Sequence, residues 1–190
     1  MSFPEAIDTE RLHLRRFVPS DLGAVEAVWA DPDVQESLRP GEKVDPPAAA
    51  RETIDRRIAN WQRDGFGLYL MIERDADQAI GWTGPWLQDL SLAHTGEVEI
   101  GWTLRRPWWG RGLATEAAIS AADATFAHLD LPRFISLIHP SNKRSLALAQ
   151  RLGMTNDGVA QHKDRNDLEL LVYSMSRESW GASPHSRPSR

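Results

Sequence analysis

The chain has 190 residues, a formal net charge of −5 and no cysteine. Its length suits one domain that buries a core without cross-links, and the lack of thiols excludes disulfides, thiolate metal sites and a cysteine nucleophile. The negative charge argues against a nucleic-acid partner, and because the sequence shows neither a secretion signal nor roughly 18 consecutive apolar residues, we expect a cytoplasmic protein without membrane contact.

The first part of the chain is predicted to contain one strand and two helices. Residues 12–17 are expected to form the strand, and the apolar spacing over 21–30 is typical of a helix with one buried stripe. A polar, proline-containing loop is expected over 35–46. Pro47 suits the first turn of a second helix, which should extend to Asp64.

The remainder of the chain is predicted to be rich in strands. The expected elements are strands at 67–73, 78–86 and 97–104, a helix at 112–129, a strand at 134–138, a helix at 143–152, and strands at 154–161 and 168–176 joined by a turn at Arg165-Asn166-Asp167. The order β-α-α-β-β-β-α-β-α-β-β describes a mixed sheet with helices on both faces, of the α+β class. We expect a single domain over 1–180 and a disordered tail over 181–190, which is rich in Ser, Pro and Arg.

The segment Gly96–Ala118 predicts an anion-binding turn. A strand leads through 109–112, which contains two glycines, into a helix whose first N–H groups have no partner within the helix. Together with the helix dipole these amides suit a pyrophosphate, and glycine lets the backbone approach the ligand. The side chains of Arg105, Arg106 and Arg111 are candidates for additional phosphate contacts.

Two common nucleotide motifs fit this turn poorly. A P-loop has Lys and Ser/Thr after its last glycine, where this chain has Leu113 and Ala114. A dinucleotide fingerprint needs a third glycine at the position of Thr115. A phosphate-binding domain of another kind, without preference for coenzyme A (CoA) over ATP, stays an alternative.

The turn resembles the pyrophosphate loop of the GNAT acetyltransferase superfamily, Gln/Arg-x-x-Gly-x-Gly/Ala. The run Trp109–Ala114 is similar to the form found in the RimJ/RimL-type branch, which is named for enzymes that acetylate ribosomal-protein N-termini. The segments Thr9–Arg15, Asn142–Met154 and Tyr173–Trp180 agree with that branch in order and spacing. Trp109 replaces the superfamily's first Gln/Arg, with little expected loss because backbone amides carry most of the binding.

The resemblance implies a central, mostly antiparallel mixed sheet of the acyl-CoA N-acyltransferase fold, with acetyl-CoA as co-substrate. The residues that it assigns to the coenzyme are Thr103, Leu104, Arg106, Trp109, Gly110, Arg111, Gly112, Leu113, Ala114, Thr115, Asn142 and Ser145. The six histidines lack the spacing of metal ligands, so no metal is expected. A homodimer is common among such proteins and is a possible state here.

Two acidic residues are candidates for the general base. Glu97 and Glu99 alternate onto one face of their strand, where mutual repulsion and burial would raise the pKa of at least one carboxyl group toward neutral pH. The resemblance implies that such a glutamate accepts a proton from the amine, commonly through water. Glu99 is the first candidate and Glu97 the second, and a solvated strand face is the alternative. Ser145 is the candidate acid for the CoA thiol, or a group that only orients it.

The resemblance further implies acetyl transfer to a primary amine by direct attack in a ternary complex. The branch favours a protein N-terminal α-amine, with a small-molecule amine close behind, and a non-catalytic acyl-CoA sensor is the alternative. The acceptor should contact residues 35–43, the second helix and the turn near Arg165. The residues Trp82, Trp86, Trp102, Trp108 and Trp109 are candidates to line an acceptor cleft, a dimer interface or the core.

Overall fold

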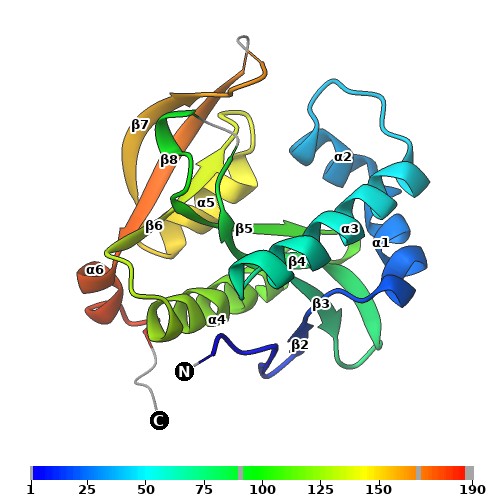
Figure 1. Ribbon diagram of the computed structural model, residues 1–190, viewed down its shortest axis with the longest axis horizontal. Coiled ribbons are helices and arrows are strands. Elements are labelled where there is room, and N and C mark those ends of the chain that lie inside the picture. The colour runs from blue at the N-terminus through cyan, green and yellow to red at the C-terminus, as the bar shows by residue number, and fades with distance from the viewer. Residues whose placement is uncertain (1, 90–91, 166–167, 187–190) are drawn as a thin grey trace.

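A computed structural model describes residues 2–89, 92–165 and 168–186 (Figure 1). One eight-stranded sheet runs through it in the order β1-β2-β3-β4-β5-β6-β8-β7. The strands are β1 (Ala6–Asp8), β2 (Leu12–Arg15), β3 (Tyr69–Glu73), β4 (Gln78–Leu87), β5 (Val98–Leu104), β6 (Arg133–Ile138), β7 (Thr155–Gln161) and β8 (Glu169–Ser176). Neighbouring strands are antiparallel except β5 and β6, which are parallel. The predicted α+β mixed sheet is therefore confirmed.

Helices cover both faces of the sheet, as Figure 1 shows. They are α1 (Leu22–Trp29), α2 (Pro32–Leu38), α3 (Pro46–Asp64), α4 (Leu113–His128), α5 (Lys143–Arg151) and α6 (Arg177–Gly181), with 3-10 turns η1 (Pro19–Asp21), η2 (Leu92–His94) and η3 (Arg106–Trp108). Leu70 packs with α1 and α3, whereas its neighbours Tyr69 and Met71 pack with α4. This alternation along β3 separates the two helical layers, because successive strand side chains point to opposite faces.

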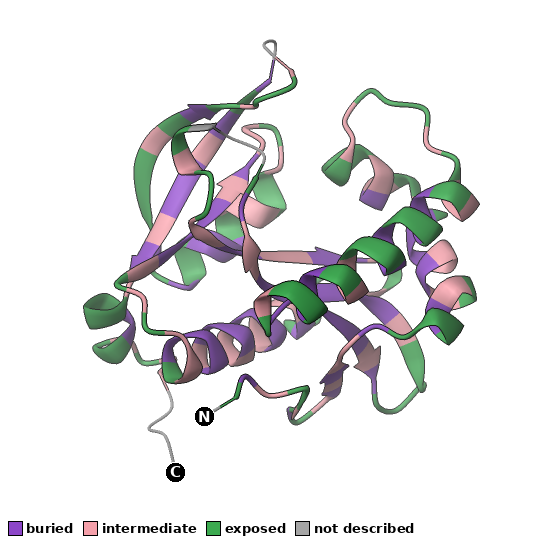
Figure 2. Cartoon of the chain, in the orientation of Figure 1, coloured by how far each residue is buried: buried purple, intermediate pink, exposed green. Residues whose placement is uncertain are grey.

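Small side chains allow α4 to lie close to the sheet. Ala117, Ala118, Ala121 and Ala122 are all fully buried, and the buried stripe that they form is visible in Figure 2. Close packing of this kind gives many dispersion contacts without large side chains. Among the described residues, none of the helices combines the length and the apolar character needed to cross a bilayer.

The structure differs from the sequence prediction between α1 and α3. Residues 35–38, expected within a loop, belong to α2, which begins at Pro32 and is capped by Asp31, whose Oδ1 accepts a hydrogen bond from the N–H of Asp33 at 3.0 Å. Only Val34 of α2 is buried, so this short helix has no apolar periodicity from which to predict it. The short β1 and α6 were likewise not expected.

Two predictions extend beyond the described residues. Asn166 and Asp167 of the expected turn lie outside them, and so do residues 187–190 of the expected tail. The tail was predicted to begin at Gly181, which is the last residue of α6. The domain boundary at residue 180 stays a prediction.

The sheet opens between its two parallel strands. Glu99 of β5 faces Ile135 of β6, and this is the one register pair of that junction among the described residues. By contrast, β4 and β5 share seven register pairs from Gly81↔Leu104 to Leu87↔Val98. Strands β5 and β6 therefore separate beyond Glu99, which leaves backbone groups at the opening free to meet side chains or ligands.

Candidate active site

A cavity of about 1630 Å³ passes through the region where β5 and β6 separate. Its walls come from both faces of the sheet: Arg57 and Trp86 lie on the α3 side, and Leu148 lies on the α5 side. The predicted acceptor-contacting segments contribute Glu36 and Arg165 among others. All five tryptophans named as cleft candidates also line it. One continuous space thus connects the two helical layers.

Glu99 lies in the wall of this cavity at the opening of the sheet. It is 4% exposed, and its Oε1 accepts a hydrogen bond of 3.3 Å from the N–H of Leu137, a group that β5 no longer pairs. Its Oε2 is buried without a hydrogen-bond partner among the described residues. Burial raises the pKa of Glu99 to about 8, against the opposing effects of the Leu137 amide and the Arg57 charge. The carboxyl group can therefore exchange a proton near neutral pH.

Glu97 lies apart from this cavity. It precedes the first residue of β5, and its carboxylate pairs with Arg133 at 2.9 Å and with Nδ1 of His94 at 2.8 Å. Among the described residues that line the cavity, Glu99 is present and Glu97 is not. The structure therefore brings only one of the two candidate bases into this space.

Trp86 shapes the surroundings of Glu99. The two residues are cross-strand partners, and the Trp86 indole covers β5 so closely that a Cβ atom on Gly101 would lie 2.5 Å from Cη2 of the ring. Only glycine leaves room for this contact. The guanidinium carbon of Arg57 lies 5.7 Å from the centroid of the same ring, so the half-buried Arg57 and the buried Glu99 both lie beside Trp86.

The predicted anion-binding turn also borders the cavity. Gly110 (φ 74°) and Gly112 (φ 78°) have left-handed backbone conformations, and Gly112 is the N-cap of α4 without a side-chain hydrogen bond to the helix. A Cβ on Gly110 would meet nothing within 4 Å, so the backbone is open to approach. The first amides of α4 thus face this space without side-chain caps, as an anion site requires.

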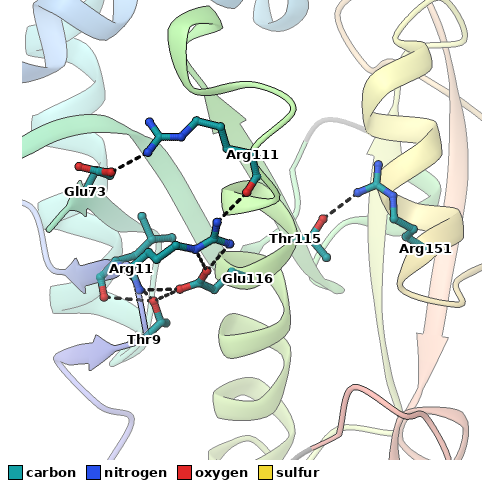
Figure 3. Close-up of polar contacts among 8 residues, drawn as sticks. Thr9, Arg11, Glu73, Arg111, Thr115, Glu116 and Arg151 are labelled. Atoms are coloured by element: carbon teal, nitrogen blue, oxygen red, sulfur yellow. Dashed lines mark hydrogen bonds and ion pairs between the residues drawn. The ribbon is translucent and has the colours of Figure 1, made fainter. Parts of the chain in front are cut away.

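A hydrogen-bond network holds this turn from the side of β2 (Figure 3). Nη1 of Arg11 donates to the carbonyl oxygen of Arg111 at 2.7 Å, and Nε of Arg11 donates to Glu116 at 2.7 Å. Glu116 also accepts from the hydroxyl group of Thr9 at 2.6 Å. The network joins the N-terminal segment to the first turn of α4 and keeps the glycine turn in one conformation.

The three arginines predicted to contact phosphate have other partners in this structure. Arg111 pairs with Glu73 at 3.0 Å, as Figure 3 shows, and Arg106 pairs with Asp33 at 3.0 Å. The backbone N–H of Arg106, expected to meet the coenzyme, donates to Asp31. Arg105 lies over the ring of Trp108. None of the three is among the residues that line the cavity.

Two arginines of α5 lie beside the turn instead. The guanidinium carbon of Arg144 is 4.1 Å from the centroid of the Trp109 ring, and Nη1 of Arg151 donates to the hydroxyl of Thr115 at 2.7 Å (Figure 3). Both line the cavity. Sequence reasoning missed them, although seven residues are close to two helical turns and place them on one side of α5.

Asn142 and Ser145 meet at the start of α5. Oδ1 of Asn142 caps the helix by accepting from the N–H of Ser145 at 3.1 Å. The Ser145 hydroxyl oxygen accepts from the indole N–H of Trp102 at 3.2 Å, so its own hydrogen can be donated to a ligand. Both residues line the cavity together with Thr103 and Leu104 of β5.

Comparisons with known proteins agree on one family. A family model described as "Acetyltransferase (GNAT) domain" matches residues 11–155. The uncharacterized N-acetyltransferase p20 of Bacillus licheniformis is 29% identical over 175 residues, which cover 90% of this chain and 95% of the relative. An acetyltransferase from Agrobacterium tumefaciens has a crystal structure with 30% identity and a TM-score of 0.75, covering 93% of this chain and 96% of its own. RimL, a ribosomal L7/L12 α-N-protein acetyltransferase solved with coenzyme A, shares the fold at 19% identity and a TM-score of 0.72, over 94% and 99% of the chains.

Proposed function

The chain belongs to the GNAT acetyltransferase family, and from that premise we propose that it transfers the acetyl group of acetyl-CoA to a primary amine by direct attack in a ternary complex. The observation that carries the proposal is the continuity of the cavity. It runs from the uncapped amides of α4, through the opening between β5 and β6, to the buried carboxyl group of Glu99. Such a path suits a long, anionic co-substrate whose reactive end must meet a base.

The coenzyme fits the residues at the α4 end. The amides from Gly110 to Thr115 would hold the diphosphate, since they combine an uncapped helix N-terminus with left-handed glycines and open space. Arg144 and Arg151 add positive charge on one side of the turn. The edge of β5 at Thr103 and Leu104 would pair with the amide groups of the pantetheine arm.

The proposed base has a pKa suited to its task. Glu99, with a pKa of about 8, would take the proton of the attacking amine, directly or through water. An α-amine has an ordinary pKa near 8 and a lysine side chain near 10.4, so proton transfer to Glu99 is nearly balanced for an α-amine and costs more for lysine. This match favours α-amines, of proteins or of small molecules, as acceptors.

Ser145 would act on the leaving group. As the carbon–sulfur bond of the thioester breaks, the CoA sulfur gains negative charge, which the Ser145 hydroxyl can stabilise by donating its hydrogen. The bond from Trp102 to the Ser145 oxygen orients that hydroxyl and makes it a better donor. The acceptor ammonium group gives up two protons: the first goes to Glu99 and then to solvent, and the second, lost from the nitrogen as the amide forms, ends on the CoA sulfur.

An acceptor panel tests the proposal. The purified protein is mixed with acetyl-CoA and with small amines, amino acids or peptides, and the release of free thiol is followed. We expect acetyl-CoA to bind and at least one α-amine to give enzyme-dependent thiol release. Binding of acetyl-CoA without release on any acceptor would contradict catalysis and favour the sensor alternative.

A further inference from the structure

Arg57 is a cation for which the described residues supply no hydrogen-bonded counter-ion. It projects from α3, lines the cavity and is half-buried. Its Nε is shielded from solvent and has no hydrogen-bond partner in the described part of the chain. A guanidinium group carries five N–H donors in a planar fork, so leaving buried donors unused is costly unless a ligand supplies acceptors.

The charge of Arg57 is poorly compensated by its surroundings. Burial, and after it the charge of the neighbouring Arg56, lower the pKa of Arg57 to about 9, against the opposing charges of Glu99, Asp89 and Glu52. A guanidinium group is ordinarily protonated at any physiological pH. The lowered pKa of Arg57 therefore reflects a cation whose burial is not fully offset by the three carboxylates around it.

The carboxylates around Arg57 are otherwise engaged. Glu52 pairs with Arg39 at 2.6 Å, and Asp89 pairs with Lys163 at 3.5 Å. Glu99 directs one oxygen to the Leu137 amide, and its other oxygen is buried and unpartnered, as is Nε of Arg57. The site thus presents an unused carboxyl oxygen and an unused guanidinium donor, both on residues that lie beside Trp86.

This arrangement complements a molecule that carries opposite charges of its own. Because it rests on the proposed function, the inference concerns the acceptor: we infer that the acceptor is a small amine with a nearby carboxylate, such as a free amino acid, and that Arg57 binds this carboxylate while Glu99 faces the amine. A carboxylate matches the guanidinium fork with two parallel hydrogen bonds. Trp29, Trp82 and Trp86 belong to one apolar cluster and also line the cavity, so an apolar or aromatic side chain of the acceptor would pack against them.

The inference separates two acceptor classes that share an α-amine. In a free amino acid the amine and a charged carboxylate are attached to one carbon atom. In a protein N-terminus that carboxyl group is part of a neutral peptide bond. Arg57 would therefore favour free amino acids over peptide N-termini.

Matched acceptors test the inference on the unaltered protein. Each free amino acid is compared with its own amide, which keeps the amine and the side chain but lacks the charge. Binding is measured by calorimetry with CoA present, and KM by thiol release with acetyl-CoA. We expect the preferred acid to bind roughly ten- to hundredfold more tightly than its amide, as a charge-assisted hydrogen bond would give.

Variants of α3 assign the preference to Arg57. Arg57→Gln should reduce the acid-to-amide ratio to near one, mainly through KM, and Arg57→Lys should retain part of it because the charge remains without the fork. Arg51→Gln is the matched control, since Arg51 lies on the same helix, is exposed and does not line the cavity. It should keep the full ratio. Circular dichroism verifies folding, and if Arg57→Gln does not fold, Arg57→Lys and the acid–amide comparison decide.

The outcomes separate this inference from the proposed function. Equal binding of acids and amides by the unaltered protein, or an undiminished ratio in Arg57→Gln, overturns the inference while amine acetylation stands. Thiol release with peptides but not with free amino acids also overturns it. If no acceptor releases thiol but acids still bind better than amides through Arg57, the carboxylate subsite stands and the proposed catalytic function fails.

Discussion

The two ends of the cavity are built from different parts of the chain. At the α4 end, the binding groups are backbone amides presented by Gly110 and Gly112, and no side chain caps the helix. At the other end, the functional groups are the side chains of Glu99, which is buried, and of Arg57, which is half-buried beside Trp86. A site made of backbone depends on conformation and tolerates changes of side chain, whereas a site made of buried charges depends on the identity of each residue.

The largest difference between the two ends is expected when the carboxyl group of Glu99 is replaced by a neutral amide. Glu99→Gln keeps the shape but cannot accept a proton, so kcat/KM should fall by roughly 10²–10⁴-fold. The Kd for acetyl-CoA, set at the α4 end, should be unchanged. Steady-state kinetics and calorimetry measure both, and a variant within threefold of the parent rate would remove Glu99 from the mechanism.

The pH profile of the same variant gives an independent check. In the parent, kcat/KM should rise with pH through about 8, since Glu99 must lose its proton before it can act as a base. The acceptor amine contributes its own rising limb. In Glu99→Gln, the rise of kcat/KM with pH that is due to the carboxyl group should disappear, whereas the rise that is due to deprotonation of the acceptor amine should remain.

At the α4 end, Gly112→Trp tests whether acetyl-CoA binding depends on the backbone of the glycine turn. The substitution places a large side chain on a residue with φ of 78° at the mouth of the turn. We expect the Kd for acetyl-CoA to rise by about 100-fold or more, as loss of several charge-assisted hydrogen bonds implies. Gly65→Trp is the control, because Gly65 has a φ of 74°, open surroundings and a position at the end of α3. Equal affinity in both variants would refute the coenzyme loop.

Burial of Glu99 should also be visible in stability. Its pKa in the folded chain is about 8, above the ordinary value of 4.5, so the folded state keeps a proton that the unfolded chain loses between these values. The parent therefore loses stability relative to Glu99→Gln as the pH rises from 4.5 to 8. Thermal unfolding should show that the free energy of unfolding of Glu99→Gln increases relative to that of the parent by about 2 kcal/mol or more between pH 5 and 8.5. A difference independent of pH would mean that Glu99 is not buried in its neutral form.

The smallest effect is expected at Ser145, which lies between the two ends. Ser145→Ala should lower kcat by about three- to tenfold, because one neutral hydrogen bond to the leaving sulfur is lost. The KM for acetyl-CoA should change little. Thiol-release kinetics decide, and a full-rate variant would leave Ser145 with only a part in the helix.

Much of the fold could be predicted along the chain because the signals are local. The strands around 67–73 and 97–104 and the long helix after Gly112 lie close to their predicted places, since their periodicity and glycines act within a few residues. Helix α2 was missed because its one buried residue, Val34, leaves no pattern. Its cap at Asp31 is local, but the contacts of Asp31 and Asp33 with Arg106 arise only when η3 lies nearby.

The candidate site divides in the same way. The glycine turn was found by its residues, whereas the partners of charged side chains were not. In the structure, Arg111 forms an ion pair with Glu73, and Glu97 pairs with Arg133 and His94. Long charged side chains pair with residues from distant segments, so the spacing of residues within one segment cannot predict their partners.

By itself, the sequence determined the order of the longer elements, the mixed sheet and the glycine turn ahead of α4, because these depend on periodicity, caps and backbone freedom. Only the tertiary structure decided that Glu99 rather than Glu97 lines the cavity, and that Arg57 lines the same cavity beside Trp86. The reason is physical: burial and electrostatic environment are created when β5, β6 and α3 come together, and pKa values follow from that environment.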